Sequence, residues 1–216
     1  MQQYDIVFLG HYTKDTIISQ AGTRYVDGGA FNYGAQMAAR LGMKVGAVTR
    51  LAKEDQRVVD ALEKLGISTH ITYTEQSTCL ILEYPTSNVD ERLIHVQSTA
   101  SSFTPEDVAG ISAKCFLIGP SIRGEVPEEV LDALRATGTR ISLDVQGFLR
   151  IPVNGTLVND SWADKARILP KVDVLKTDAV EAHMLTGTTD IYKAAQILAD
   201  YGPEEVVLTH RNGVLV

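Results

Sequence analysis

The chain has 216 residues, of which 44% are hydrophobic and 22% charged, with a formal net charge of −7. This size and composition suffice for one large core, so we expect a single domain spanning 1–216, with a small appendage. The acidic balance argues against nucleic acid and anionic membranes as partners, because both need clustered Lys and Arg, and no apolar run approaches the roughly 20 residues of a membrane span.

Strand and helix patterns alternate along almost the whole chain. Short apolar runs predict strands at 4–10, 44–51, 68–74, 115–120, 140–147, 173–178 and 204–210. Amphipathic or Ala-rich segments predict helices at 32–42, 54–66, 126–138, 162–172, 179–187 and 190–202, and a helix start at 104–111. Such alternation is typical of an α/β fold with a mostly parallel sheet covered by helices on both faces.

Two segments interrupt this alternation. Residues 15–27 and 78–97 place alternating β-formers around Ala-Gly and around Pro-Thr-Ser-Asn, which predicts two hairpins with no neighbouring helix. Together they could form a small antiparallel sheet over one edge of the main sheet, as a lid or a dimer surface. An ordinary surface β-ribbon explains the pattern equally well.

The C-terminal segment VVLTHRNGVLV, residues 206–216, predicts a strand, a tight turn and the opening of another strand. A closing strand left in mid-ladder would expose unpaired backbone groups. We therefore expect the chemistry begun upstream to be completed by residues that this chain does not contain.

Several site classes are disfavoured by residue spacing. Cys79 and Cys115 lie far apart in apolar runs, which predicts buried reduced thiols and a cytoplasmic protein. The histidines show no zinc-ligand spacing, and no G-x-S-x-G segment indicates a hydrolase. A small-molecule partner is therefore the expectation.

Two glycines stand directly before the helix at 32–42, in VDGGAFNYG. Glycine lets the backbone approach a ligand closely, and a helix N-terminus offers free N–H groups, so Gly28 and Gly29 predict a ligand-cradling turn. A flexible loop that only sets the entry angle of the helix explains them as well. The spacing is not G-x-G-x-x-G, so a dinucleotide fingerprint is not supported.

The stretch DVQGFLR follows a strand. It places Asp144, Gln146 and Arg150 at the carboxyl end of the predicted sheet, which is the usual ligand edge of open α/β folds. An arginine at this edge suits an anion. Considered alone, a solvated turn in which Asp144 caps a local group is the simpler interpretation.

Asp178 and Glu181 stand three residues apart where a strand gives way to a helix. Two carboxylates on one helix face can hold Mg²⁺ through water, because that ion keeps much of its hydration shell. The same spacing is close to a capping box, which is a strong competing interpretation.

Taken together, the motifs resemble those of the ribokinase-like, or PfkB, carbohydrate kinases. The resemblance spans essentially the whole chain and rests on the order DIVFLGHYTKDTI, GGAFNYGAQMAARLG, FLIGP, ISLDVQGFLR, VLKTDAVEAHMLTG and VVLTHRNGVLV. It implies a ribokinase-like three-layer sandwich with a β-sheet lid, formed by hairpins at about 12–27 and 77–98, through which some members dimerise. It also implies transfer of phosphate from ATP, with Mg²⁺, to a hydroxyl of a sugar, polyol or nucleoside.

The resemblance also implies substrate-binding residues. Asp15 matches the aspartate that grips substrate hydroxyls, and Gly28 and Gly29 match the glycine pair that lines the same pocket. The expected substrate-binding set further includes Asn32, Tyr33, Gln146 and Arg150.

Other matches concern the phosphate donor. Lys176, Asp178 and Glu181 match the motif that organises Mg²⁺ and phosphate near ATP, with Glu181 as the metal-directed residue. Thr209 and Gly213 match the strand and turn at the nucleotide edge.

The chain departs from the family pattern at three points. Aligning ARLG places Tyr33 where members commonly have Asn, with Asn32 one residue earlier, which affects the substrate contacts. Asp178 replaces the more usual Asn, and the THRNG turn is one residue shorter than the common form. This combination is similar to the branch that contains inositol kinases.

In this family a Gly-Ala-Gly-Asp motif follows later, and supplies an anion hole and the general base. No such motif occurs before Val216, so we expect the base beyond this chain and no turnover from the chain as given. A noncatalytic sugar-binding or regulatory protein of the same fold is the alternative. An NAD-linked oxidoreductase is disfavoured by the missing glycine fingerprint.

Overall fold

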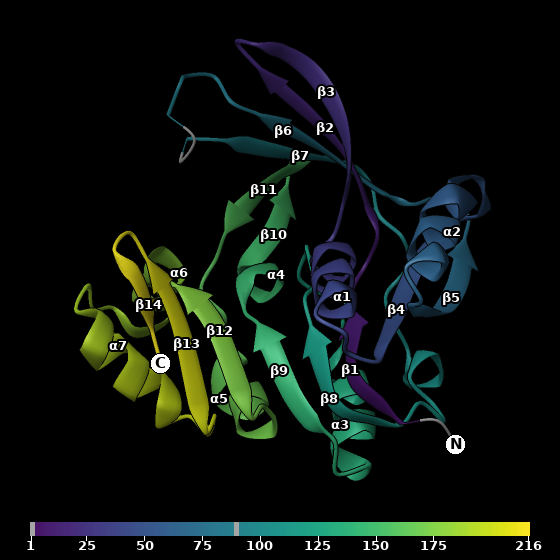
Figure 1. Cartoon of the computed structure of the whole chain (residues 1–216). Coiled ribbons are helices and arrows are strands. Elements are labelled where there is room, and N and C mark those ends of the chain that lie inside the picture. Colours follow the sequence, from purple (N-terminus) through teal and green to yellow (C-terminus); the bar gives the residue numbers. More distant parts are fainter. Residues whose placement is uncertain (1–2, 89–90) are drawn as a thin grey trace.

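The molecule is built on two β-sheets, the larger below the smaller in Figure 1. The structure is a computed structural model, and it describes residues 3–88 and 91–216. The larger sheet is flanked by helices, and the smaller sheet stands over one edge of it.

The main sheet has eight strands, and every neighbouring pair is parallel except the last, β13 with β14. In spatial order it contains β5 (Ser68–Thr74), β4 (Val45–Ala52), β1 (Tyr4–Leu9), β8 (Ala113–Ile118), β9 (Arg140–Asp144), β12 (Val174–Asp178), β13 (Glu205–His210) and β14 (Gly213–Leu215). The expected mostly parallel sheet is therefore confirmed.

Helices pack on both faces of this sheet. Because side chains alternate along a strand, β1 sends Phe8 into one core with α1 (Ala30–Arg40) and α2 (Gln56–Lys64). Val7 and Leu9 point the other way, into a larger core. That core is covered by α3 (Glu128–Ala136), α5 (Lys165–Ile168), α6 (Ala179–Thr186) and α7 (Ile191–Ala199). The result is the predicted three-layer arrangement.

The second sheet contains six strands, paired as three antiparallel hairpins. Their bounds are β2 (Thr13–Ser19) with β3 (Gly22–Gly28), β6 (Thr78–Glu83) with β7 (Leu93–Ser98), and β10 (Arg150–Val153) with β11 (Thr156–Asn159). The first two hairpins lie where the sequence predicts them. The parallel pairing of β2 with β6 joins the two hairpins into one sheet.

The third hairpin was not predicted, although its signal is present. Asn154 and Gly155 form its turn, and both have positive φ angles, 50° and 80°. A two-residue Asn-Gly loop with positive φ at both positions matches the right-handed twist of the flanking strands, so it is a strong hairpin signal.

Three helix and strand boundaries also differ from expectation. The helix expected to start at 104–111 is only a 3₁₀ turn at Pro105–Asp107. The Asp107 carboxylate accepts hydrogen bonds from Arg50 and Thr72. The strand expected over 140–147 ends at Asp144, and Gln146–Leu149 form the short helix α4. The helix expected at 162–172 is reduced to α5 and a 3₁₀ turn that contains Pro170, which cannot donate a helical hydrogen bond.

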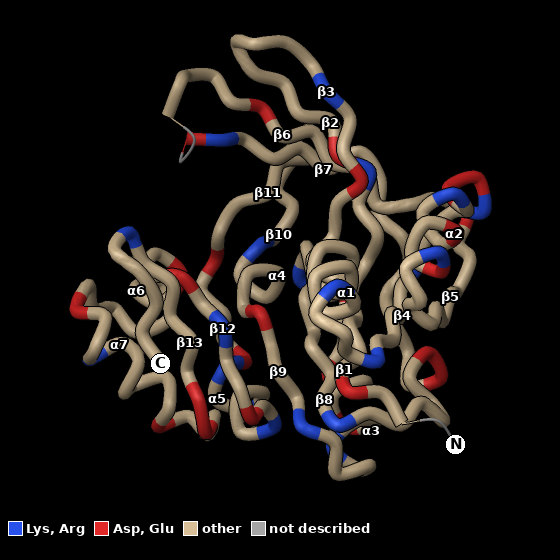
Figure 2. Tube along the Cα trace, viewed as in Figure 1, with Lys and Arg blue, Asp and Glu red and all other residues tan. Residues whose placement is uncertain are grey.

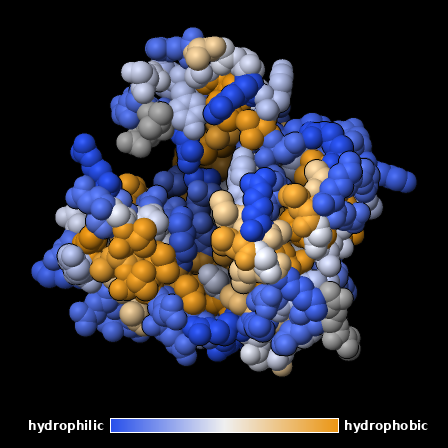
Figure 3. Space-filling model, in the orientation of Figure 1, coloured by the Kyte–Doolittle hydropathy of each residue, from blue (hydrophilic) through white to orange (hydrophobic). Residues whose placement is uncertain are grey.

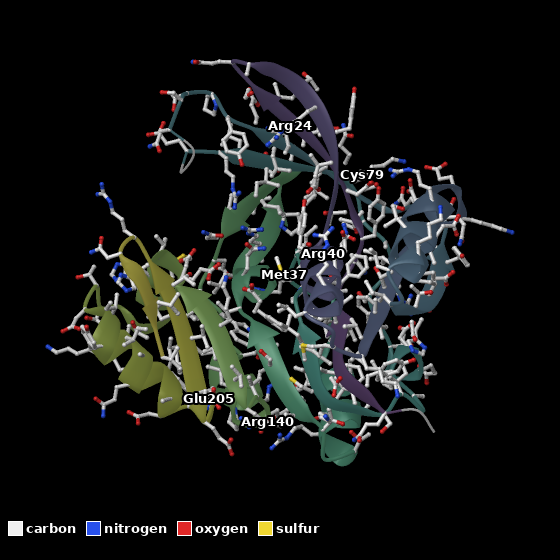
Figure 4. All side chains as sticks on the ribbon, viewed as in Figure 1. Arg24, Met37, Arg40, Cys79, Arg140 and Glu205 are labelled. Atoms are coloured by element: carbon white, nitrogen blue, oxygen red, sulfur yellow. The ribbon has the colours of Figure 1, made fainter. Side chains whose placement is uncertain are left out.

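The parallel strands all point their carboxyl ends towards the second sheet (Figure 1). At the opposite edge, Arg140 Nη2 lies 3.3 Å from Glu205 Oε1, and Figure 4 labels both residues there. Within the described residues, no helix is long and apolar enough to cross a membrane. Cys79 and Cys115 are free thiols. Both are half-buried, whereas the sequence predicts that they are buried.

Candidate functional site

A polar hollow separates the two sheets at the carboxyl ends of the main-sheet strands, and Figure 3 shows hydrophilic residues lining it. It contains two cavities. Cavity A, about 350 Å³, lies against β2, β3 and the start of α1, and cavity B, about 390 Å³, lies against the start of α6. Both are lined by Arg92, Ile94 and Arg150, so the two cavities adjoin.

Cavity A collects most of the predicted substrate-binding residues. They come from three separate segments of the chain, brought together by the two sheets: Asp15, Gly29, Tyr33, Gln146 and Arg150 all line it. Asp144 and Ser121 line it as well. Hydroxyl, carboxylate, amide and guanidinium groups together suit a small polyhydroxylated ligand.

Asp15 has an unsatisfied acceptor in cavity A. Its Oδ1 atom is buried and has no hydrogen-bond partner among the described residues. Burial raises the pKa of this carboxyl, and a hydrogen bond from the Thr13 side chain only partly opposes that effect. A buried oxygen without a partner is costly, so Asp15 is prepared to accept a hydrogen bond from a ligand hydroxyl.

Both glycines are in close contact with neighbouring groups, and Gly28 leaves the space that the Asp15 side chain occupies. A Cβ at Gly28 would lie 2.3 Å from both Asp15 Oδ2 and Thr13 Oγ1. A Cβ at Gly29 would lie 2.4 Å from the backbone oxygen of His11, and Gly29 has a φ of +97° that side chains rarely adopt. The glycine pair is therefore required by close approach, beyond any role in setting the helix entry angle.

We expect Gly28→Ala to fold but to weaken binding of a polyol such as myo-inositol. The new methyl group must displace the Asp15 carboxylate, and losing one hydrogen bond to a charged group costs about 1.5–3 kcal/mol, or roughly tenfold or more in affinity. Calorimetric titration checks the affinity, and far-UV circular dichroism checks the fold. An unchanged affinity in a folded variant would contradict this role for Gly28.

Asn32 and Tyr33 are the two residues at which the chain departs from the family pattern, and only Tyr33 lines cavity A. The structure does not bring Asn32 to cavity A: its Nδ2 donates to the Asp27 carbonyl at 3.1 Å and its Oδ1 accepts from Gln36 at 2.9 Å. Tyr33 lines the cavity, and burial together with the Asp15 charge raises the pKa of its phenol. The side chain at position 33 is therefore the one available to a ligand.

Asp178 and Glu181 form the capping box that competed with the metal interpretation. Glu181 Oε2 accepts from the Asp178 N–H, and Asp178 Oδ1 accepts from the Glu181 N–H, both at 2.8 Å. Each carboxylate retains a second oxygen, and both residues line cavity B. Burial and the Asp178 charge raise the pKa of Glu181. Carboxylate oxygens at a cavity are ligands that fit Mg²⁺, so capping and metal binding are compatible.

The remaining donor-side residues line neither cavity. Lys176 Nζ lies 3.1 Å from Asp144 Oδ2, and this ion pair lies at the boundary with cavity A. Thr209 is the register partner of Asp178 on β13, and its Oγ1 donates to the Thr177 carbonyl at 3.4 Å. Gly213 is the first residue of β14, directly after the turn, and pairs with His210 of β13. Among described residues no group of three His, Cys, Asp or Glu side chains gathers as a metal site.

Sequence reasoning did not identify Arg92. It follows the β6–β7 loop, and only the folding of that hairpin over the main sheet brings it to the cavities. Figure 2 shows basic positions near β7 and at the start of β10, and acidic positions at the carboxyl end of β12. No sequence pattern around ERLIH marks Arg92 as a site residue.

Comparison with known proteins assigns the family. A family model described as pfkB family carbohydrate kinase matches residues 4–213. The chain belongs to this family. The two cavities therefore lie in a carbohydrate-kinase fold, with Asp15 and Gly29 lining one and the capping box of α6 lining the other.

Several relatives of the kinase resemble it over nearly its whole length. A cytidine kinase of Thermococcus kodakarensis is 30% identical over 98% of this chain and 75% of its own. A pyrophosphate-dependent kinase of the ribokinase family, solved with sulfate, has a TM-score of 0.91 and 32% identity over 97% of this chain and 74% of its own. Ribokinase of Arabidopsis thaliana, solved with ribose and ATP, has a TM-score of 0.68 and 17% identity over 96% and 72% of the two chains.

Proposed function

We propose that the kinase binds a small polyhydroxylated acceptor in cavity A and phosphorylates one of its hydroxyls. The observation that carries this proposal is the adjoining pair of cavities. One is lined by Asp15, whose Oδ1 has no hydrogen-bond partner in the described part of the chain, and the other by Asp178 and Glu181. A sugar, a polyol such as an inositol, or a nucleoside has the hydroxyls that such a cavity would bind. The relatives at 30–32% identity, a cytidine kinase and a pyrophosphate-dependent kinase, are in keeping with that range.

The reaction we propose is phosphoryl transfer between the two cavities. Asp15 accepts a hydrogen bond from an acceptor hydroxyl, and Tyr33 and Gln146 line the cavity that would orient the rest of the molecule. A bond forms from the acceptor oxygen to phosphorus as the bond from phosphorus to the donor's bridging oxygen breaks, and a base takes up the hydroxyl proton. The second oxygens of Asp178 and Glu181 would hold Mg²⁺, which supplies charge neutralisation at the transferred group.

The second sheet would act as a lid in this scheme. It covers the polar hollow, and exclusion of water strengthens electrostatic interactions and limits hydrolysis of the donor. Dimerisation through this lid is a further proposal, supported by the exposed Ile18 and Tyr25 on β2 and β3. We also place the kinase in the cytoplasm, in keeping with its two free cysteines.

ATP is the donor that the ribokinase fold suggests, and pyrophosphate is a second candidate. The ribokinase solved with ATP is only 17% identical to this chain. A ribokinase-family kinase solved with a pyrophosphate analog and myo-inositol is 31% identical, with a TM-score of 0.89. We therefore include both donors in the test.

A thermal-shift panel tests the proposed function. Sugars, inositols and nucleosides are added singly to the chain, each with and without Mg²⁺ and with ATP or pyrophosphate. We expect one acceptor class to raise the melting temperature, because a ligand that binds only the folded state stabilises it by mass action. Release of ADP or phosphate in the same mixtures reports on turnover.

The outcomes separate the candidate functions. Stabilisation by an acceptor and by a donor supports the kinase. Stabilisation by an acceptor alone, with no donor binding, supports the noncatalytic sugar-binding alternative. If no polyhydroxylated compound stabilises the chain at millimolar concentration, then the proposed function is wrong.

A further inference from the structure

Two arginines meet at the junction of the cavities, and they reach it from different parts of the chain. Arg92 lies one residue before β7 in the second sheet, and Arg150 opens β10 directly after α4. Both line cavity A and cavity B, and Ile94 is the one other residue of the described ranges that lines both. The junction between the proposed acceptor and donor sites is therefore basic.

Neither guanidinium has an ion-pair partner among the described residues. Arg150 makes no side-chain hydrogen bond within this set, and Arg92 makes only a long one, 3.5 Å from Nη1 to the Tyr84 hydroxyl. By contrast, Arg50, Arg57, Arg123, Arg135 and Arg140 each lie within 4 Å of a carboxylate. The two junction arginines thus differ from the arginines that stabilise the fold.

The surroundings make this arrangement unfavourable without an anion. Burial and the nearby Arg92 charge lower the pKa of Arg150 to about 10, and the more distant carboxylates of Glu181, Asp144 and Asp178 only partly offset this. Asp144 is also bound to Lys176 at 3.1 Å, and Asp178 and Glu181 cap α6. Two like charges beside a half-buried junction are stabilised when a doubly charged anion lies between them.

We propose that Arg92 and Arg150 together bind the phosphoryl group in transfer, holding its non-bridging oxygens between the acceptor and the donor. This inference rests on the proposed function. A guanidinium presents a planar fork of donors that matches phosphate oxygens, and two such forks would also fix the orientation of the group in transfer. Arg92 and Arg150 then neutralise the developing charge of the transferred group, and Asp178 and Glu181 would hold Mg²⁺, which would supply further charge neutralisation.

The same arginines could instead bind an anionic group that the acceptor itself carries. The position of the pair argues against this as their main use, because both residues also line cavity B, beside Asp178 and Glu181. An acceptor-specific arginine would line cavity A alone. The experiment below separates the two uses.

Titration of the chain with inorganic pyrophosphate, by calorimetry and with and without Mg²⁺, tests the proposal. We expect the unsubstituted chain to bind pyrophosphate, and Arg92→Met and Arg150→Met each to weaken that binding roughly tenfold or more, the loss for one charged hydrogen-bond donor. The double variant loses pyrophosphate binding. Because both arginines also line cavity A, affinity for the neutral acceptor found in the thermal-shift panel falls as well, but by a smaller factor than affinity for pyrophosphate.

Arg40→Met is the matched control. Arg40 lies in the last turn of α1, where Figure 4 labels it, and it lines neither cavity. We expect its pyrophosphate affinity to equal that of the unsubstituted chain. Arg92→Lys and Arg150→Lys keep the charge but not the fork, so they should retain partial binding, and they replace the Met variants if those do not fold.

Three results would overturn the proposal: no pyrophosphate binding by the unsubstituted chain, unchanged affinity in both single variants, or a loss confined to the acceptor. The last would assign the arginines to an anionic acceptor. Failure of the proposed function gives a separate result, because arginine-dependent pyrophosphate binding would then persist while no polyhydroxylated compound binds. Inorganic sulfate at matched ionic strength distinguishes a phosphate site from nonspecific attraction of anions.

Discussion

Asp15→Asn is expected to weaken acceptor binding roughly a hundredfold, the effect of about two hydrogen bonds to a charged acceptor at 1.5 kcal/mol each. An asparagine keeps one oxygen, but its NH₂ group would face ligand hydroxyls that donate to the carboxylate. Binding is measured by calorimetric titration with the acceptor from the thermal-shift panel. Because the buried Oδ1 has no partner among the described residues, we expect its contribution to appear in ligand binding.

The same substitution should not lower stability at neutral pH. The folded-state pKa of Asp15 is raised by burial, so ionisation of this group disfavours the folded state. That penalty is absent below the unfolded pKa near 3.8 and grows as the pH rises through the folded value. Asp15→Asn removes the penalty, so urea unfolding should show its advantage over the parent chain growing with pH across this window.

Asp200→Asn provides the control. Asp200 is exposed after α7, and the substitution should change neither acceptor affinity nor the pH dependence of unfolding. If Asp15→Asn binds the acceptor as tightly as the parent chain, Asp15 does not hold its hydroxyls. If it is markedly less stable at neutral pH, the carboxylate is satisfied in a way that the structure does not show.

Glu125→Ala is expected to cost about 3–5 kcal/mol of unfolding free energy, as removal of one member of a buried charged network does. The Glu125 side chain is only 1% exposed and lies 3.5 Å from His11 Nδ1. Its Oε1 accepts from the His11 N–H at 2.7 Å, and its Oε2 accepts from the Ser121 N–H at 2.8 Å. This carboxylate therefore joins the segments that follow β1 and β8, and Ser121 lines cavity A.

Glu125→Gln should be destabilising by a smaller amount, about 1–3 kcal/mol, because its amide can accept one backbone N–H but turns a donor towards the other. Urea unfolding followed by circular dichroism measures both variants, and an unchanged slope shows that the comparison is one of stability. Glu129→Ala, at an exposed position on α3, should change stability by less than about 0.5 kcal/mol. A Glu125→Gln protein as stable as the parent would exclude the network.

The sequence predicts well those features that depend on local pattern. The alternation of apolar runs predicts all the parallel strands, and the structure places Asp15 and Gly29 in the lining of one cavity. Spacing alone also identifies the Asp178–Glu181 capping box. Each of these depends on neighbours within a few residues, which is the range over which sequence patterns carry information.

Features that depend on long-range packing were not predictable in this way. Arg92 acquires its position from the pairing of β6 with β2 and β7, and Glu125 is held by backbone N–H groups in the segments that follow β1 and β8. Asn32 illustrates the reverse case, because one residue along a helix turns a side chain by about 100° and directs Asn32 away from cavity A. The β10–β11 hairpin, in contrast, had a local signal in Asn154-Gly155 that was overlooked.

The three hairpins of the second sheet leave the main body and return to it, so the sheet is attached along its whole width and not by a single hinge. A sheet connected at several points does not rotate as a rigid body about one hinge. Any inward movement must be taken up by flexing of the hairpins, greatest near their tips and least near their roots. Arg150 lies at the base of its hairpin, and Arg92 lies closer to the loop of another. We therefore expect the Arg150 guanidinium to stay in place while Arg92 moves towards the bound phosphoryl group.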